Sequence, residues 1–339
     1  MAFINDIVIN IANGARGLTQ KSFRPVIFQA ASGANYDKYI ITELTDLVDL
    51  GIPSSSNVYK MAAAAFAQSP RPKDIMVVIA SGTLENELPR SRTIDDNYYA
   101  VLIPERTKAA QQIAGDFALS NKKMFFGGSS DLTVLDSRNN KREAYLLHST
   151  PENFPETAWV GKILPKQPGS ATWKFQVLEG QIESGFTSTQ LNTIRTNKGN
   201  ALQEQKGQVF TNEGITTSGE YIDVTIGTDW VEDQLNIDLL SLFINNDKIA
   251  MDNTGIAQVT AVVRGVLKRA GDAGIIARAT TEAELKKSDD KFYMYQVFSP
   301  RREDLATNDL ATRNLKGITF VYYLAGAIHE VEVNGLITV

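Results

Sequence analysis

The chain has 339 residues, 43% of them hydrophobic and 22% charged, a composition typical of a soluble globular protein with roughly two or three domains. It contains no cysteine and only two histidines, His148 and His329, which excludes disulfides, thiolate metal sites and thiol nucleophiles and disfavours most zinc sites. The net charge of -5, with scattered basic residues, argues against nucleic acid as a main partner.

Neither a membrane span nor a signal peptide is predicted. No apolar run approaches the ~20 residues that a spanning helix needs. The N-terminus carries an aspartate and lacks a basic segment, so we expect synthesis and folding in a cytoplasm.

The chain begins with a predicted strand and a linker. Residues 3–11 alternate in polarity, which is typical of a strand with one apolar face. The residues on that face are Ile7, Ile9 and Ile11. Residues 13–21 are polar, and Gly14 and Gly17 predict a flexible connection there.

The next segment alternates strands and helices. Strands are predicted at 24–29, 74–80, 98–103 and 124–127, and helices at 57–68 and 104–119. This spacing predicts an α/β layer structure with a largely parallel sheet. The following stretch is less regular, with predicted strands at 144–147 and 173–178, helices within 151–165 and at 187–196, and no clear prediction for 198–205.

The pattern becomes clearer toward the C-terminus. A turn and strand are predicted at 214–226, and Thr228 or Asp229 would cap a helix at 230–245. A second helix is predicted at 256–269, capped within 252–254. A strand at 292–298 and a charged helix at 301–314 follow.

The chain ends in two predicted strands, at 318–324 and 328–339. The second alternates, with Ile328, Val331, Val333, Ile337 and Val339 as its apolar residues. Gly326 and Gly335 lie where a bend or bulge would fit. Because chain ends usually fray unless they are held, this pattern predicts a C-terminus inside a sheet. The N- and C-terminal strands can pair with each other or with a neighbouring molecule, and the sequence leaves both open.

The motifs give no active site. No phosphate-binding GxxxxGK[ST] or GxGxxG and no GxSxG elbow occurs, and the glycine pair at 127–128 lacks a nucleotide-loop lysine. His329 and Glu330 lack the second histidine of HExxH, and His148 has no evident catalytic partners. The adjacent acids at 95–96 and 289–290 lie in polar loops, where carboxylates are usually solvated. We therefore expect no catalytic, cofactor or metal site.

Basic residues gather on the predicted helix 256–269. Arg264 and Lys268 share one face, and Arg269 lies beside them. Two interpretations remain open: a solvated face with cations near a helix C-terminus, or a basic surface for an acidic partner protein.

The last third of the chain resembles the C-terminal domain of contractile phage tail sheath proteins. The similarity rests on ordered motifs, namely residues 219–224 (GEYIDV), 227–230 (GTDW), 246–249 (NDKI), 252–256 (DNTGI) and 325–329 (AGAIH), with Val331, Val333 and Gly335 after them. Each motif alone is only a turn, cap or strand, and their order and position make the match specific. The α/β region before them supports the resemblance little.

The resemblance implies a fold and a division of the chain. It implies an α+β protein overall, with an outer α/β region before an α+β sheath domain. The expected segments are an N-terminal β arm and linker (1–21), the outer region, possibly as two subdomains (22–210), the sheath domain (211–325) and a C-terminal β arm (326–339). Gly14, Gly17, Gly326 and Gly335 would act as hinges.

The resemblance also implies a structural role without catalysis or cofactor. Subunits would form hexameric rings stacked around an inner tube protein, linked through strands that the two arms donate, and would also meet baseplate and tail terminator proteins. Arg264, Lys268 and Arg269 become candidate tube contacts. The particle would be a phage virion tail, a bacteriocin or another injection system, without nucleic acid or membrane partners. Two alternatives remain: a non-contractile tube or pilus-like subunit, and an α/β enzyme with an unrecognised site.

Overall fold

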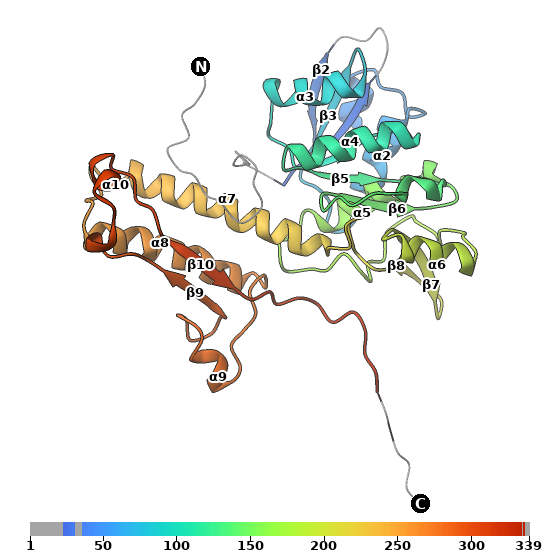
Figure 1. The fold of residues 1–339 in the computed structure, drawn as a ribbon. Coiled ribbons are helices and arrows are strands. Elements are labelled where there is room, and N and C mark those ends of the chain that lie inside the picture. Colours follow the sequence, from blue (N-terminus) through green and yellow to red (C-terminus); the bar gives the residue numbers. More distant parts are fainter. Residues whose placement is uncertain (1–22, 31–35, 334, 336–339) are drawn as a thin grey trace, which may run out of the picture.

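The computed structural model describes residues 23–30, 36–333 and 335. Figure 1 shows a sheet covered by helices, from which the long helix α7 (Ile222–Ile244) extends to one side together with the C-terminal elements. The predicted N-terminal strand with Ile7, Ile9 and Ile11, the glycines at 14 and 17, and Ile337 and Val339 lie outside the described residues.

An eight-stranded mixed sheet forms the centre of the first part, in the order β2-β3-β1-β4-β5-β6-β7-β8. Its strands are β1 (Pro25–Ala30), β2 (Asp37–Ile41), β3 (Ile75–Ala80), β4 (Ala100–Leu102), β5 (Met124–Gly127), β6 (Glu143–Leu147), β7 (Asn200–Gln205) and β8 (Gln208–Thr211). The strands from β3 to β7 in this order pair in parallel, and the edge strands β2 and β8 are antiparallel. The predicted α/β layer structure is confirmed.

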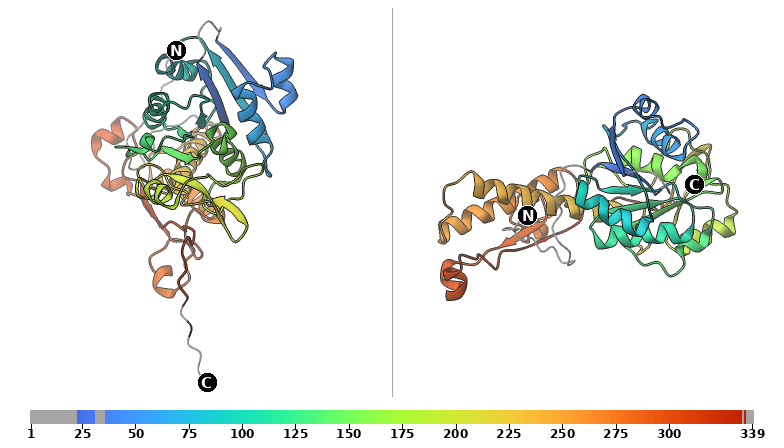
Figure 2. Two further views of the ribbon diagram at one scale, coloured as in Figure 1. Left: turned by 90° about the vertical axis from the view of Figure 1, so that its right-hand side faces the viewer. Right: turned by 90° about the horizontal axis from the view of Figure 1, so that it is seen from above.

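Helices cover both faces of this sheet (Figure 2). They are α1 (Leu44–Asp49), α2 (Asn57–Phe66), α3 (Leu84–Ile94), α4 (Lys108–Ser120), α5 (Pro155–Ile163) and α6 (Ser188–Thr196), with single 3-10 turns η1 (Leu132–Leu135) and η2 (Pro151–Asn153). Successive residues of a strand point to opposite faces, so Ile27 packs with α1, α2 and α5 while Val26 and Phe28 pack with α3 and α4. Burial on both faces explains the continuously apolar sequences of β1 and β3.

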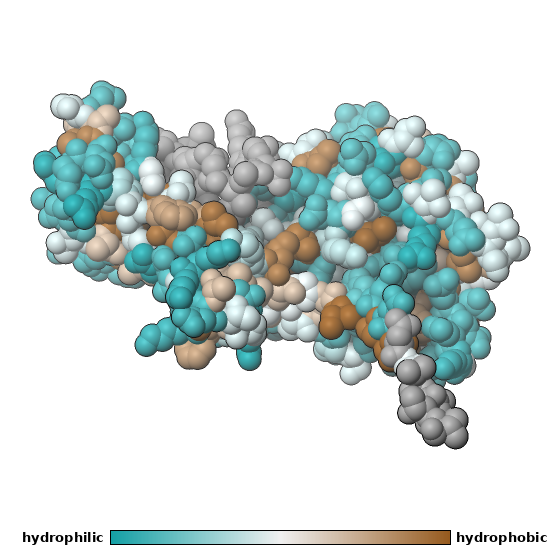
Figure 3. Space-filling model, turned by 60° about the horizontal axis from the view of Figure 1, so that its bottom comes forward, coloured by the Kyte–Doolittle hydropathy of each residue, from teal (hydrophilic) through white to brown (hydrophobic). Residues whose placement is uncertain are grey.

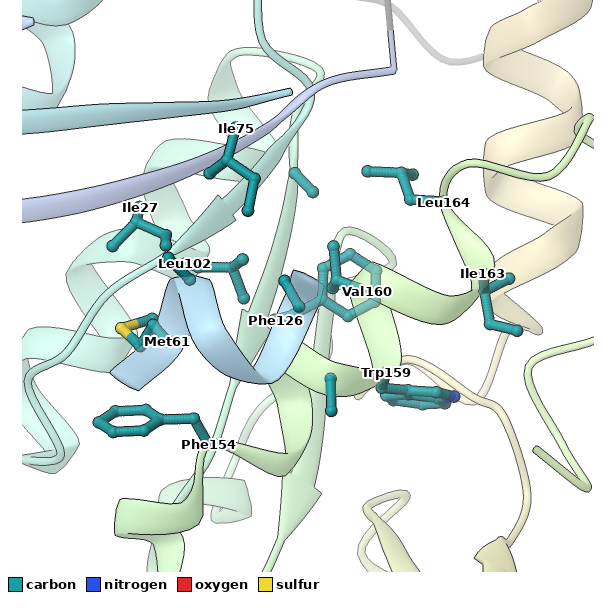
Figure 4. Close-up of a cluster of buried hydrophobic side chains, with 14 of the residues drawn as sticks. Ile27, Met61, Ile75, Leu102, Phe126, Phe154, Trp159, Val160, Ile163 and Leu164 are labelled. Carbon is teal, nitrogen blue, oxygen red and sulfur yellow. The ribbon is translucent and has the colours of Figure 1, made fainter. Parts of the chain in front are cut away.

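The core on the α2 and α5 side contains two buried tryptophans. Figure 4 shows Trp159 on α5 near Phe126 of β5, and the Trp159 ring also meets that of Trp173 at 5.0 Å between centroids. The Trp159 indole nitrogen donates to the Trp173 carbonyl oxygen at 3.0 Å, so its polar atom is satisfied. Gly161 is required here because a Cβ atom would lie 2.7 Å from the Ala65 backbone of α2.

The C-terminal elements pack around the far part of α7. They are α8 (Asn253–Asp272), α9 (Glu282–Leu285), β9 (Tyr295–Phe298), η3 (Arg302–Asp304), α10 (Thr307–Ala311) and β10 (Thr319–Tyr322). A third buried cluster joins Val231 and Leu235 of α7 to α8 and β9. As predicted, Asp252 caps α8, its carboxylate accepting from the Gly255 amide at 2.9 Å.

The predicted strand at 214–226 and the cap at Thr228 or Asp229 are wrong. α7 already begins at Ile222, and Asp229 lies buried inside it. The β-branched residues at 222–228 favour a strand locally, but the buried residues Ile222, Ile226 and Asp229 recur at helical spacing against the sheet. Tertiary packing has overridden local preference.

Two other local predictions are wrong. Residues 173–178 form no strand, because Phe175 adopts a left-handed conformation with φ of 61°. The helix predicted at 301–314 is two short turns, η3 and α10, because the backbone is extended at Leu305 and Ala306. No strand forms within residues 328–333 of the predicted last strand, and the chain is mostly exposed there.

Candidate assembly surfaces

A buried polar cluster fixes α7 to the sheet. Arg142 lies just before β6, and both of its terminal nitrogens donate hydrogen bonds to the Asp229 carboxylate at 2.6 Å. Tyr99 lies just before β4, and its hydroxyl donates to the same carboxylate at 2.6 Å. Burial, with the adjacent Asp229 carboxylate, raises the pKa of Tyr99 well above its usual value, so the phenol keeps its proton. The charge-assisted bidentate geometry favours one orientation of α7.

A second ion pair strengthens this attachment one turn along the helix. Lys122, just before β5, pairs with Glu232 of α7, and both side chains are almost fully buried. Burial raises the pKa of Glu232, and the bond from Lys122 opposes this shift. We call these five residues, Tyr99, Lys122, Arg142, Asp229 and Glu232, the α7 joint.

Beyond the joint, α7 exposes apolar side chains. The exposed residues are Ile237, Leu240, Phe243 and Ile244, which we call the distal face of α7. Ile244 is 72% exposed, although it lies in the last turn of a well-formed helix. Figure 3 shows other hydrophobic residues on the surface, including some beside the outgoing C-terminal tail. A helix with apolar residues on most sides is normally buried, so this face fits an assembly contact.

β9 and β10 form a separate two-stranded antiparallel sheet in the described part of the chain. Phe320 pairs with Val297, and Tyr322 with Tyr295. An isolated two-stranded sheet is marginal by itself, and here α8 supports it through Tyr293, Tyr295 and Val297. The outer edge of β9 is already bonded within the chain, since the Asp289 amide donates to the Tyr295 carbonyl oxygen at 2.9 Å and the Val297 amide donates to the Asp289 carboxylate at 3.0 Å.

The start of the C-terminal arm rests on the body of the molecule. Residues 324–330, which we call the arm root, begin with an antiparallel bridge between Leu324 and Ile276. The Ala325 amide then donates to the Ile275 carbonyl oxygen at 2.9 Å.

His329 holds the far end of the arm root. Its Nε2 lies 2.8 Å from the Thr172 hydroxyl, and its ring meets those of Tyr221 and Phe175 edge-on, with centroids 4.9 and 6.2 Å away. Arg195 pairs with Glu330 at 3.1 Å. We call Thr172, Phe175, Arg195 and Tyr221 the arm cradle. The apolar side chains around it face solvent, with Ile328, Val331 and Val333 at least 75% exposed.

The three predicted tube-contact residues lie on α8 and are partly exposed. Each is paired within the chain: Arg264 with Asp289 at 3.1 Å, Lys268 with Asp272 at 3.4 Å, and Arg269 with Asp238 at 2.5 Å. The structure therefore brings them onto one helix but surrounds them with acids. Their contact with a tube stays a prediction.

The residues considered for catalysis have structural partners. The His148 ring Nδ1 accepts from the Thr150 amide at 2.9 Å, which holds the loop after β6. Asp95 pairs with Lys38, and Asp96 pairs with Arg92 and Lys123. Asp290 accepts from the Phe292 amide at 2.7 Å and so closes a turn.

The carboxyl ends of the parallel strands, where α/β proteins usually bind ligands, are filled by side chains. Arg106 donates to the Gly128 and Pro151 carbonyl oxygens and to Glu156, and Gln111 also donates to Gly128. A Cβ atom on Gly128 would lie 2.3 Å from Glu156 Oε2, so this glycine allows close packing.

Two further features are absent from the described residues. Residues 23–30, 36–333 and 335 contain no group of three acidic or histidine side chains arranged to hold a metal ion. Every helix in the same ranges is too short or too polar to cross a lipid bilayer.

Solved structures of contractile machines share this fold over the whole chain. A chain of the anti-feeding prophage baseplate, 6-fold symmetrised, superposes with a TM-score of 0.67 at 11% identity, covering 100% of both chains. A chain of the contracted PVC sheath complex, an extracellular contractile injection system, gives 0.65 at 11% identity, covering 99% of this chain and 98% of that one. The sheath tail protein from Desulfitobacterium hafniense gives 0.57 at 8%, covering 86% and 93%. The chain shares its fold with these proteins.

The sequence supports the same conclusion in the C-terminal part. Residues 222–337 match the family of the E217 tail sheath protein gp31-like C-terminal domain. No curated protein sequence matches the chain. Residues 222–337 are therefore similar to the C-terminal domain of a tail sheath protein, and the whole chain shares the fold of the solved sheath structures.

Sequence reasoning missed the residues that attach α7 and the arm root. The sequence predicts Thr228 or Asp229 as a helix cap, and Arg142, Lys122 and Glu232 belong to no motif. Thr172 and Tyr221, which hold His329, lie 157 and 108 positions before it in the chain. The one available signal was Asp229, Glu232 and Asp233 within an otherwise apolar helix, since such acids are buried only with partners.

Proposed function

We propose that this chain is the repeating subunit of a contractile sheath, built from stacked hexameric rings around an inner tube. Contraction drives the tube through a target cell envelope. The particle is a phage tail or a released phage-tail-like machine such as a bacteriocin, and the sheath also meets its baseplate and tail terminator proteins. The sheath fold over the whole chain supports this role.

The proposed link between subunits rests mainly on the C-terminal arm. Residues 328–333 follow β10 and are mostly exposed, and in the described part of the chain β9 and β10 form a sheet of two strands. We propose that the two arms add strands to this small sheet in neighbouring subunits. Backbone hydrogen bonds then supply the strength of the link, and the alternating side chains fix its register.

The distal face of α7 supports a second contact in the array, with a neighbouring copy of this chain. Four exposed apolar side chains on one helix disfavour a permanent monomer, and permanent subunit interfaces are the more hydrophobic ones. The charged surface of α8 fits a tube contact instead, because such a contact must hold before contraction and release during it.

The domain boundaries follow from this role. We propose that residues 1–21 and 326–339 are the arms, that 211–325 form the sheath domain that carries the array, and that 22–210 form an outer region. The α7 joint then connects the outer region to the array.

Electron microscopy of the purified chain at high concentration tests the proposal. We expect hollow, ribbed cylinders with six subunits per ring. In a contractile sheath, the length of a cylinder divided by its number of subunits decreases after a trigger. In a non-contractile tube, this ratio stays the same. A protein that stays monomeric under all conditions would contradict the proposal and redirect attention to an enzymatic role of the α/β region.

A further inference from the structure

The elements around the far part of α7 carry two exposed apolar faces. The first is the distal face of α7. The second lies on the β9–β10 sheet and consists of the side chains that alternate with the buried ones along each strand. We call it the open face of the sheet, and its residues are Met294, Gln296, Phe298, Thr319, Val321 and Tyr323.

One buried cluster lies between these two faces, so they point away from each other. The cluster contains Leu235 of α7 and Val297 of β9, and Phe320 of β10 packs against it. Neighbouring residues of a strand point to opposite sides of a sheet, so the open face is turned away from the cluster. Ile244 follows Leu235 by about two and a half helical turns, which places it on the opposite side of α7. Figure 1 shows α7 along one side of the C-terminal elements and β9 with β10 along the other.

The two faces have the same chemical character. On α7, Leu240 is 50% exposed and Ile244 72%, and on the sheet Phe298 and Val321 are each 50% exposed. Neither face contains a charged residue. An uncharged apolar surface is complementary to another of its kind, so each face fits the other better than it fits a charged partner.

The shapes of the two faces also differ in a way that bears on assembly. Ile237, Leu240 and Ile244 follow one another at spacings of three and four residues and form a ridge along the helix. The open face belongs to two paired strands and is broad. A ridge that met the same ridge of a second copy would close a two-fold dimer, whereas a ridge on a sheet face leaves one face of each subunit for the next. Only the second arrangement repeats along an array.

From this arrangement we infer that the distal face of α7 in one subunit packs on the open face of the β9–β10 sheet in the next subunit. The inference rests on the proposed sheath and names the surface that the neighbouring copy presents to α7. Strand addition uses the edge of a sheet, and this contact uses its face. One sheet can therefore take part in both.

Cross-linking tests the inference, because the chain has no cysteine of its own. Leu240→Cys is made in a tagged chain and Val321→Cys in an untagged one, and both positions are half exposed, so the substitutions should be tolerated. The two variants are mixed, assembled into cylinders and treated with a short bismaleimide. We expect dimers that contain one tagged and one untagged chain.

A matched pair controls for random contact within the cylinders. Leu119→Cys, an exposed apolar position on α4, replaces Val321→Cys in the mixture and should give no dimer with Leu240→Cys. Leu240→Cys chains that join only to each other would show that two α7 helices meet, and would overturn the inference. Cylinders in which the reagent joins neither mixture would also overturn it, since α7 would then contact a different surface.

Substitutions separate the inference from the proposed function. Val321→Lys and Leu240→Lys should each raise the threshold concentration for cylinder formation about tenfold or more, because each places a charge in an apolar contact, and Leu119→Lys should not. Thermal melting checks that each variant is folded. Normal assembly of Val321→Lys beside impaired assembly of Leu240→Lys would reject the pairing and leave the sheath in place. A wild-type chain that forms no cylinders would reject the sheath, and this contact with it.

Discussion

At the scale of single residues, the α7 joint holds charged side chains in a buried position. Arg142 and Asp229 are 8% and 2% exposed, so neither charge is satisfied by water when the other is removed. Such a pair adds little net stability compared with apolar residues of the same size, but losing one partner is costly. The joint therefore determines the direction in which α7 leaves the sheet more than it determines whether the protein folds.

Replacing Arg142 should test this directly. We expect Arg142→Ala to lower the free energy of unfolding by about 3–5 kcal/mol, because Asp229 is left charged and buried. Arg264→Ala removes an exposed pair and should cost no more than about 1 kcal/mol. Urea unfolding of both variants measures the difference. Equal losses would mean that the buried pair is not the stronger constraint.

The His329 contacts should depend on pH. Burial, followed by nearby Lys174, lowers the pKa of His329, and the acids Asp223, Glu213 and Glu330 oppose this shift. Because the bound histidine holds its proton less tightly than a free one, binding of the arm root is complete above the free pKa of about 6.5 and is lost as pH falls through the lower, bound pKa. The NMR signal of the Ala325 amide should follow this change.

His329→Gln controls for other titrating groups. The amide cannot titrate in this range and can still hydrogen-bond to Thr172. The variant should keep the arm root bound down to about pH 5. An identical pH response in both proteins would show that His329 is not the group responsible.

At the scale of elements, the two ends of α7 lie in different environments. Its first turns are buried against the sheet and its last turns expose apolar residues. The isolated subunit does not need the exposed residues for folding, since they contact solvent. Their replacement should therefore separate assembly from stability.

We expect Leu240→Lys with Phe243→Lys to block cylinder formation and to leave the melting temperature nearly unchanged. Leu235→Ala, a change at a buried position on the same helix, should instead cost about 2–5 kcal/mol of stability. Sedimentation and thermal melting of the variants distinguish the two effects. Normal cylinders from the double variant would remove the distal face from the array.

The α8 cations give a second prediction at this scale. Changing Arg264, Lys268 and Arg269 together to glutamate breaks three exposed ion pairs, which contribute little because solvent screens them, so the protein should stay folded and self-assemble. Assembly on purified tube should be impaired, as measured by co-sedimentation. Lys286→Glu, an exposed change at the C-terminal cap of α9, is the matched control. Unchanged tube binding would show that these cations do not contact the tube.

At the scale of the whole molecule, the two proposed terminal arms can be tested by deletion. Deleting residues 3–11 or 328–339 should leave a folded monomer that no longer forms cylinders, because the strands that link subunits are gone. Size-exclusion chromatography and electron microscopy measure both properties. Normal cylinders from both deleted chains would contradict strand exchange, and an unfolded product would show that the arm also stabilises its own subunit.

The sequence alone determined the features that depend on neighbours along the chain. Apolar runs placed β1, β3 and β5, and the cap within 252–254 placed α8, because hydrophobic periodicity and side chains near a helix end act locally. The ordered motifs of the last third indicated the sheath family, and the alternating C-terminus indicated a strand in need of a partner. β2, α1 and α3 were missed, since their sequences are too polar for a clear pattern.

Only the tertiary structure decided the contacts between distant segments. Residues 222–229 form a helix instead of the predicted strand, because Ile222, Ile226 and Asp229 pack against the sheet at helical spacing. It joined Arg142 to Asp229 and His329 to Thr172 across long stretches of chain, which no local pattern specifies. It also placed an acid beside each cation of α8. Burial and charge pairing act in space, so they became visible only when the chain was folded.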